Sequence, residues 1–388
     1  MNKKGVGRGA QGSGQIHPAP CTLHPPPLLS TIIYLYLMVQ KKTRIKDIAL
    51  LAGVSIGTVD RVIHGRGEVA EKTRQKVQAL LNETNYSPNI LAQVLKSKKR
   101  FHIVSLLPQP GENNSFWEKH PLGMESAMNE LDSFPVTLSQ VTFDIQSEED
   151  YQKKNSIVLN LKPDGVLLAP IFKNESILFC NQLEKAKIPF VFIDGFIENI
   201  DFMAYIGENI FQSGRVAGQL IDMVTPKESD ILVVTIARDI KNVHHLNGRA
   251  LGFLSYFDEK ACNTGKKITI TISDPSQESV RKAIDKAFNE NQDLGSIFIT
   301  GSRPYLIASC LKEKGLTSIN LVGYDLLNKN VGFLKSGDIS FLIGQRPEEQ
   351  AYKGIKKLFE FLSSNKVPDK IEYLPIDIVT SENVDSYI

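Results

Sequence analysis

The 388-residue sequence is poor in cysteine and tryptophan, with four cysteines and a single tryptophan. Cys21, Cys180, Cys262 and Cys310 lie far apart, and no two of them form a CxxC pair. This spacing excludes a disulfide framework and a zinc site of the CxxC type, and it fits a chain that folds in a reducing compartment. The scarcity of cysteine therefore argues against a small, secreted, disulfide-stapled domain.

Several motifs of common enzyme classes are also missing. The sequence has no P-loop, no GxGxxG that follows a strand and no HExxH zinc motif. The seven histidines show no metal-binding spacing, and the adjacent pair His244 and His245 has no further ligands nearby in sequence. We therefore expect no enzyme activity, no cofactor and no bound metal.

No apolar run is long enough to cross a membrane. The most apolar segment, residues 28–39 (LLSTIIYLYLMV), follows three basic residues and so loosely imitates an export signal, but no small-residue cleavage site comes after it. The Gly- and Pro-rich stretch before it has no periodicity. We expect Met38 to be the biological start and residues 1–37 to be a non-native extension, with a disordered tail as the alternative.

Positive charge is concentrated in a short block near the N-terminus. Residues 38–100 carry thirteen Lys and Arg against five Asp and Glu, whereas residues 101–388 carry 29 against 38. A small basic block ahead of a large acidic one indicates that the block alone meets a polyanion. Length and charge together predict at least two domains with different partners.

The basic block has the pattern of three short helices. Ile45, Ile48, Ala49 and Ala52 follow helical spacing, and Gly53 supplies a helix stop that tolerates positive φ. Ser55 then has the properties of an N-cap for a second helix over 56–63, and a third helix is expected from about Ala70 to Thr84. Two short helices joined by a glycine-containing turn and braced by a third predict a helix-turn-helix over residues 38–88.

In a helix-turn-helix the start of the second helix enters the major groove of double-stranded DNA. We expect Thr43, Ser55 and Thr58 to hold phosphates and Ile56, Gly57 and Arg61 to face the bases; His64 closes the helix. Arginine can bind guanine O6 and N7 together, which gives roughly 1–3 kcal/mol of discrimination. Short amphipathic helices are common, and the plainer interpretation of Arg61 is a solvated surface charge.

The segment IKDIALLAGVSIGTVDRVIHGRGEVAEKTRQKVQALLNETNYSPN resembles, without a gap, the headpiece of the LacI/GalR family of bacterial regulators. The resemblance is carried by the AGVS turn, the TVxRVI helix, the VxxxTRxKV third helix and the NYxPN motif. It implies that Ile56, Gly57 and Arg61 stand at base-reading positions. Gly57 offers no side chain, and Asp60 replaces a small polar residue, so the operator sequence is not implied.

Residues 89–100 form a short amphipathic segment that ends in four cations. Such a segment is marginal as an isolated helix. The family resemblance implies a hinge that folds on the operator, with Asn89 at its start, Ala92 at a groove-contacting position and Leu95 as a wedge in the minor groove. An ordinary basic linker is the alternative.

From Phe101 onward, apolar strand patterns alternate with helical ones. Strands are expected at 102–107, 136–143, 165–170, 189–194, 231–236, 296–300 and 320–325, with helices near 122–131, 214–224 and 248–257. This alternation predicts parallel sheets covered on both faces, with ligands bound beyond the carboxyl ends of the strands. The segment resembles the two-lobed sensor of the same family, with the type I periplasmic-binding-protein fold and chain crossovers near 200, 344 and 375.

Polar and aromatic side chains follow several of these strands, which is the combination that a sugar site requires. By resemblance, Arg249 (NGRALGF), Asp325 (GYD) and Gln345 (GQRPEEQ) are the first ligand-contact candidates. The others are Phe116, Trp117, Asp194, Asn209 and Arg303. A strand-end aspartate can equally cap the next helix, Trp117 can be core, and Arg249 can pair with an acid.

The sequence is therefore interpreted as a cytoplasmic, nucleoid-associated homodimer: an all-α headpiece and hinge ahead of an α/β two-lobed sensor. We expect a repressor of carbohydrate-utilisation genes that binds operator DNA under the control of a sugar, and no membrane association. An activator or a regulator governed by a protein partner would have the same sequence features. A periplasmic sugar receptor is disfavoured by residues 43–100, and the sign of the effector's action stays open.

Overall fold

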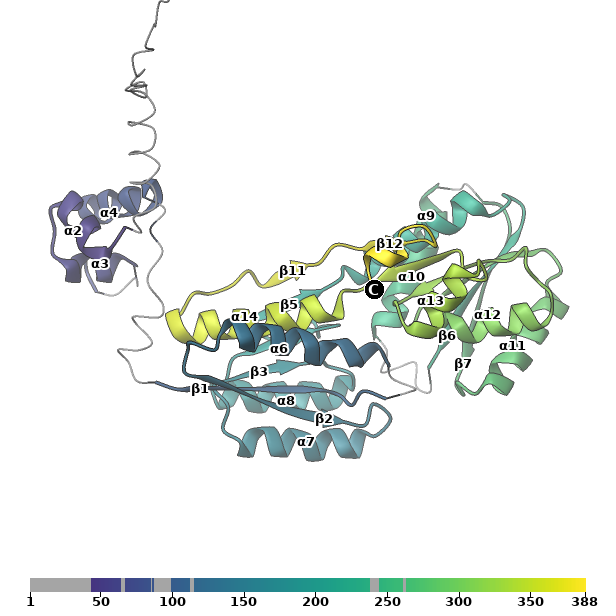
Figure 1. Cartoon of the computed structure of the whole chain (residues 1–388), viewed down its shortest axis with the longest axis horizontal. Coiled ribbons are helices and arrows are strands. Elements are labelled where there is room, and N and C mark those ends of the chain that lie inside the picture. Colours follow the sequence, from purple (N-terminus) through teal and green to yellow (C-terminus); the bar gives the residue numbers. More distant parts are fainter. Residues whose placement is uncertain are drawn as a thin grey trace, which may run out of the picture. The chain divides into compact units, whose positions relative to one another are not determined.

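The computed structural model describes residues 43–63, 67–84, 86, 99–111, 115–237, 244–260 and 263–388. The chain divides into two compact units, Met1–Asn89 and Ile90–Ile388 (Figure 1). Within the described residues, no helix is both long and apolar enough to cross a membrane.

The described part of the first unit contains three helices, α2 (Ile45–Ala52), α3 (Ile56–Ile63) and α4 (Glu71–Glu83). They enclose a small apolar core, whose buried members are Ile48, Ala49, Ala52, Val59, Val62 and Val77. Gly53 ends α2 with φ of 68°, and Ser55 Oγ accepts a hydrogen bond from the Thr58 backbone N–H at 3.1 Å. Both features confirm the predicted turn, in which a left-handed glycine and a serine cap join the two helices.

The second unit holds two six-stranded sheets, which define two lobes. The N-lobe sheet has the order β11-β5-β4-β3-β1-β2, all parallel: β1 (Phe101–Pro108), β2 (Val136–Phe143), β3 (Gly165–Leu168), β4 (Phe190–Ile193), β5 (Ala204–Gly207) and β11 (Ile371–Tyr373). Its helices are η1 (Ser115–Lys119), α6 (His120–Glu130), α7 (Glu148–Asn160), α8 (Lys173–Lys185) and α14 (Pro347–Ser364). Buried side chains of α6 and α14 form one cluster with the sheet, and those of α7 and α8 form another.

The C-lobe sheet has the order β12-β10-β9-β8-β6-β7. Its strands are β6 (Asp230–Ile236), β7 (Lys267–Ile272), β8 (Leu294–Ile299), β9 (Asn320–Tyr324), β10 (Phe341–Gly344) and β12 (Asp377–Val379). Its helices are α9 (Ile210–Val224), α10 (His244–Lys260), α11 (Gln277–Glu290), α12 (Pro304–Glu313) and α13 (Asn328–Lys335), and η3 (Val384–Ser386) follows β12. The pairing of β10 with β12 is antiparallel, a departure from the all-parallel sheets expected from the sequence.

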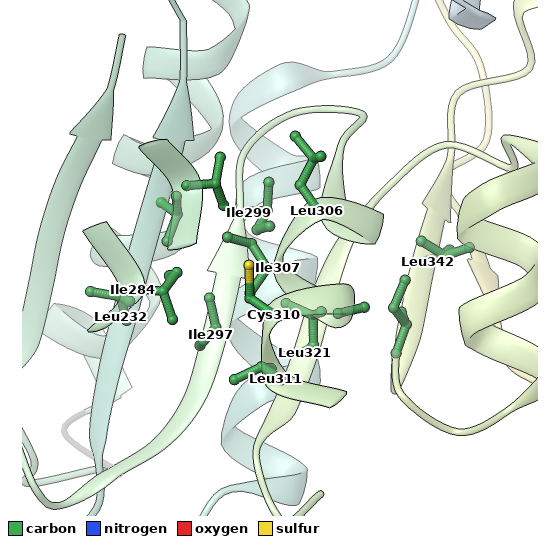
Figure 2. Close-up of a cluster of buried hydrophobic side chains, with 14 of the residues drawn as sticks. Leu232, Ile284, Ile297, Ile299, Leu306, Ile307, Cys310, Leu311, Leu321 and Leu342 are labelled. Atoms are coloured by element: carbon green, nitrogen blue, oxygen red, sulfur yellow. The ribbon is translucent and has the colours of Figure 1, made fainter. Parts of the chain in front are cut away.

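The apolar core of the C-lobe follows from the continuous apolar strands. Ile297 and Ile299 of β8 and Leu321 of β9 pack against α12 (Figure 2). Cys310 lies within this cluster and is 1% exposed, so it serves as a small apolar side chain there. Such strands are buried on both faces, which explains why they lack the alternation of a half-exposed sheet.

The chain passes between the lobes three times. It leaves the N-lobe after β5, returns between β10 and α14, and passes once more between β11 and β12. Glu208 follows β5 directly and Gln345 follows β10 directly. Because the strands end at these points, polar side chains from both lobes converge on the crossovers.

Helices α9 and α10 pack at backbone contact through glycine. A Cβ on Gly214 would lie 2.1 Å from the Arg249 carbonyl oxygen, and one on Gly252 would lie 2.0 Å from the Phe211 carbonyl oxygen. No side chain fits at such distances. The two glycines therefore fix the position of the Arg249 backbone on the C-lobe.

We expect Gly214→Ala to lower the free energy of unfolding by roughly 1–3 kcal/mol, because the added methyl group overpacks the α9–α10 contact. Gly332→Ala is the matched control: it lies in α13 and its Cβ would meet no atom within 4 Å. That change should leave stability equal or raise it by up to about 1 kcal/mol. Urea unfolding followed by circular dichroism measures both, and equal effects of the two substitutions would contradict the packing argument.

Candidate functional site

One face of α3 presents the side chains that were predicted to meet DNA. Ser55, Ile56, Gly57 and Arg61 are exposed, and Thr58 is half-buried. Ile56 is 51% exposed although it is apolar, while Val59 and Val62 on the other side of the helix are buried in the headpiece core. Exposing an apolar side chain to water is unfavourable in the free protein. At the start of such a helix, the same side chain can contact a thymine methyl group in the major groove.

Thr43 is half-buried just before α2. His64, Asn89, Ala92 and Leu95 lie outside the described residues, and their roles stay predictions.

Gly53–Gly57 also has the GxSxG spacing of a hydrolase nucleophile, but this segment follows helix α2 and not a strand, and Ser55 hydrogen-bonds to Thr58 as a helix cap.

Between the lobes lies a cavity of about 630 Å³, here called the cleft chamber. It brings together most of the predicted ligand contacts, namely Phe116, Trp117, Asp194, Arg249, Arg303 and Gln345. Asp325 lines a neighbouring cavity of about 620 Å³, which shares Gln345 with the cleft chamber. Asn209 is the N-cap of α9 and accepts a hydrogen bond from the Gln212 N–H, and it lines neither of these two cavities.

Arg249 is the centre of the polar network and is only 1% exposed. Its Nε donates to Glu208 Oε1 at 2.7 Å, its Nη2 donates to both Glu208 and Gln345, and its Nη1 donates to the Thr300 carbonyl at 2.9 Å. The guanidinium carbon also lies 3.8 Å from the centre of the Tyr324 ring. Burial is the largest single influence and lowers the pKa of Arg249, but Glu208, Tyr324, Asp325 and Asp194 together outweigh it and raise the pKa, so the side chain stays charged.

Gln345 carries the network to Asp325. Its Nε2 donates to the two carboxyl oxygens of Asp325 at 2.9 and 3.0 Å, while its backbone carbonyl accepts from Gln350 Nε2 at 2.8 Å. Gln350 Oε1 in turn accepts from the backbone N–H of Asp194 at 2.8 Å. One chain of hydrogen bonds therefore joins α10, the first two crossovers and the strand ends of the two lobes.

Asp194 and Asp325 sit in unusual surroundings for carboxyl groups. Burial raises the pKa of Asp194 to about 7 and that of Asp325 to about 6, although Arg249 opposes both shifts. Their backbones are left-handed, with φ of 67° and 72°, a strained conformation that aspartate tolerates better than most residues. Neither caps a helix, so the capping alternative does not hold for these two.

Aromatic side chains form one wall of the cleft chamber. Phe116 and Trp117 lie on η1 with ring centroids 5.2 Å apart, and the Trp117 ring stacks on His120 at 4.4 Å. Burial lowers the pKa of His120 to about 3, so the imidazole is neutral. Trp117 is 3% exposed and belongs to the N-lobe core, so it packs as core and lines the cavity at the same time.

Sequence reasoning missed Glu208, Gln350, Thr300 and Tyr324 as parts of this network. Glu208 follows β5, a four-residue strand that the sequence analysis did not predict. A glutamate directly after a short apolar run was the only local signal. Among the described residues, no group of three or more His, Cys, Asp or Glu side chains could hold a metal ion.

The raised pKa of Asp325 predicts a pH dependence of stability. The folded protein binds the proton more tightly than the unfolded chain, so this contribution is present below about pH 4 and is lost as pH rises through about 6. Asp325→Asn should therefore flatten the fall of the unfolding free energy between these pH values. Urea unfolding at pH 4.5 and 7 tests this. If the unfolding free energy changes equally between these pH values in the wild-type protein and in Asp325→Asn, the prediction is contradicted.

Comparison with known proteins agrees with this two-part architecture. The family model for bacterial regulatory proteins of the lacI family matches residues 44–89, and the model for a periplasmic binding protein domain matches residues 104–366. A structure described as a LacI transcriptional regulator from Bacteroides fragilis has a TM-score of 0.68 and 28% identity, and the match covers 75% of this chain and 100% of that one.

Two named relatives span most of both chains. The ribose operon repressor of Lactococcus lactis is 28% identical over 288 residues, or 73% of this chain and 81% of that protein. The HTH-type transcriptional repressor PurR of Proteus mirabilis is 32% identical over 287 residues, or 72% of this chain and 80% of that protein. The chain therefore belongs to the LacI family of bacterial transcription regulators.

Proposed function

We propose that this protein is a repressor of carbohydrate-utilisation genes that binds operator DNA as a homodimer, with operator affinity set by a sugar bound in the cleft chamber. The observation that carries the proposal is the pairing in one chain of an exposed α3 face with an interlobe cavity lined by aromatic rings, a buried carboxyl group and arginine. Such a protein acts in the cytoplasm, on the nucleoid.

The chemistry of the cleft chamber supports a sugar as the effector. Carboxyl groups accept hydrogen bonds from hydroxyls, and aromatic faces pack on C–H groups. Asp194 and Phe116 supply one group of each kind. A relative with 81% of its length aligned is named for the ribose operon, which agrees with this class of effector.

The geometry of α3 supports sequence-specific DNA binding. Its exposed N-terminal half would enter the major groove, and two-fold partners read two half-sites, which is the reason for proposing a homodimer. Thr43, Ser55 and Thr58 would hold phosphates, and Ile56, Gly57 and Arg61 would face the bases. Phosphate contacts fix the register, while base contacts set the sequence.

We expect Arg61→Ala to weaken operator binding by about 1–3 kcal/mol while non-specific DNA affinity stays nearly unchanged, because an exposed arginine on α3 reads a base. Gel shift with operator and scrambled DNA measures the two affinities. Arg74→Ala, an exposed arginine on α4, is the matched control. An equal loss on both DNAs for Arg61→Ala would show that this residue contacts only phosphate.

A thermal-shift screen of the full chain against sugars and sugar phosphates tests the effector. A ligand at ~100 times its dissociation constant adds about 2.7 kcal/mol of stability, which raises the melting temperature measurably. Any sugar that binds must also change operator affinity in a gel shift. Failure of every sugar, with operator binding intact, would reject sugar control and favour a protein partner.

Asp194→Asn should weaken sugar binding about 10–100-fold at pH 8, because the carboxylate is a stronger hydrogen-bond acceptor than an amide. Operator binding of the ligand-free protein should not change, since Asp194 belongs to the sensor and not to α3. Calorimetry of the sugar and gel shift of the operator measure the two effects. Unchanged sugar affinity would remove Asp194 from the ligand site.

A further inference from the structure

The interlobe space consists of two chambers of nearly equal size. The cleft chamber has a volume of about 630 Å³, and the second cavity, here called the hinge chamber, has about 620 Å³. The hinge chamber is bounded by α6 and the start of α14 from the N-lobe and by the start of α13 from the C-lobe. Each chamber alone has the size of a small-molecule site, for which ~300–1000 Å³ is typical.

The two chambers meet at a shared waist. Ser115 and Phe116 of η1, Tyr305 of α12, Leu327 and Gln345 line both chambers. The waist therefore combines side chains from both lobes with the crossover after β10. Because these five residues line both spaces, the two chambers adjoin at the waist.

Each chamber has its own buried carboxyl group. Asp194 lines the cleft chamber and is 6% exposed, and Asp325 lines the hinge chamber and is 3% exposed. Gln345 links the two halves, since its Oε1 accepts from Arg249 and its Nε2 donates to Asp325. The polar anchors of the two chambers thus form one connected set and not two separate sites.

The hinge chamber also has an aromatic component, and its lining carries more acidic than basic side chains. Tyr305 and Tyr352 supply rings. The cations are Lys119, Lys329 and Arg346, and the carboxyl groups are Glu118, Asp325, Glu348, Glu349 and Asp377. The Arg346 guanidinium is already bound to Asp377, at 2.7 Å from Nε and Nη2, and to Glu349. Such a lining favours a neutral, hydroxyl-rich group over a phosphate or a carboxylate.

We propose that the effector is a disaccharide or a longer oligosaccharide that spans the waist, with one sugar ring in the cleft chamber and the next in the hinge chamber. This inference rests on the proposed function, because it names the class of sugar for the same site. A monosaccharide would fill one chamber and leave the other carboxyl group without a ligand hydroxyl.

Calorimetry of the full chain with disaccharides and their constituent monosaccharides tests the inference. The best disaccharide should bind at least about tenfold more tightly than either of its monosaccharides, with one molecule per chain. Equal affinities, or two monosaccharides bound per chain, would overturn the spanning mode while leaving sugar control in place. If no sugar binds, the proposed function itself fails.

Blocking the hinge chamber with a large side chain distinguishes a disaccharide that spans both chambers from a sugar that binds in the cleft chamber alone. Ser126 and Asn328 are exposed and line this chamber from opposite lobes, so Ser126→Trp and Asn328→Trp should each obstruct it without disturbing the core. Each should weaken disaccharide binding about tenfold or more and change monosaccharide binding less than about twofold. Asn129→Trp, on an exposed position of α6 outside the chamber lining, is the matched control and should change neither. Unchanged disaccharide affinity in both chamber variants would overturn the proposal.

Discussion

The buried ion pair between Arg249 and Glu208 is the interaction on which the sensor architecture depends. A guanidinium that is 1% exposed is costly to bury unless its charge and its donors are matched. Glu208, Gln345 and the Thr300 carbonyl supply that match, and they come from the first crossover, the second crossover and the end of β8. One side chain therefore joins the first two crossovers to the C-lobe, and any rotation of one lobe on the other has to carry or rearrange these contacts.

The close packing of α9 on α10 fixes the position of Arg249 in this ion pair. Gly214 lets α9 approach the Arg249 backbone to a distance that no other residue permits, and Ser213 beside it hydrogen-bonds to the Tyr324 hydroxyl at 2.9 Å. Tyr324 is the ring on which the guanidinium lies. The same pair of adjacent small residues thus positions both the arginine and its aromatic partner, which connects the sequence of α9 directly to the geometry of the cleft.

Local signals explain how much of this structure was predictable. The bounds of α3, the left-handed Gly53 and the Ser55 cap depend on neighbouring residues, so the sequence alone predicts them. Arg249 and Gln345 were predicted as ligand contacts only through the family resemblance. Glu208 was missed because its partner lies 41 residues away, and Gln350 because its contact with Asp194 spans 156 residues. The strands β11 and β12, of three residues each, are too short to carry a periodic pattern.

The charge balance around Arg249 restricts the ligands that the cleft can accept. Glu208, Asp194 and Asp325 are all buried near a single buried arginine, and burial raises the pKa of both aspartates toward neutrality. An anionic group placed near them would add repulsion, and a cation would compete with Arg249 for Glu208. Neutral hydroxyls donate hydrogen bonds to carboxyl oxygens without adding charge. The same arrangement therefore suits the neutral, hydroxyl-bearing ligand that we propose better than it suits a charged one.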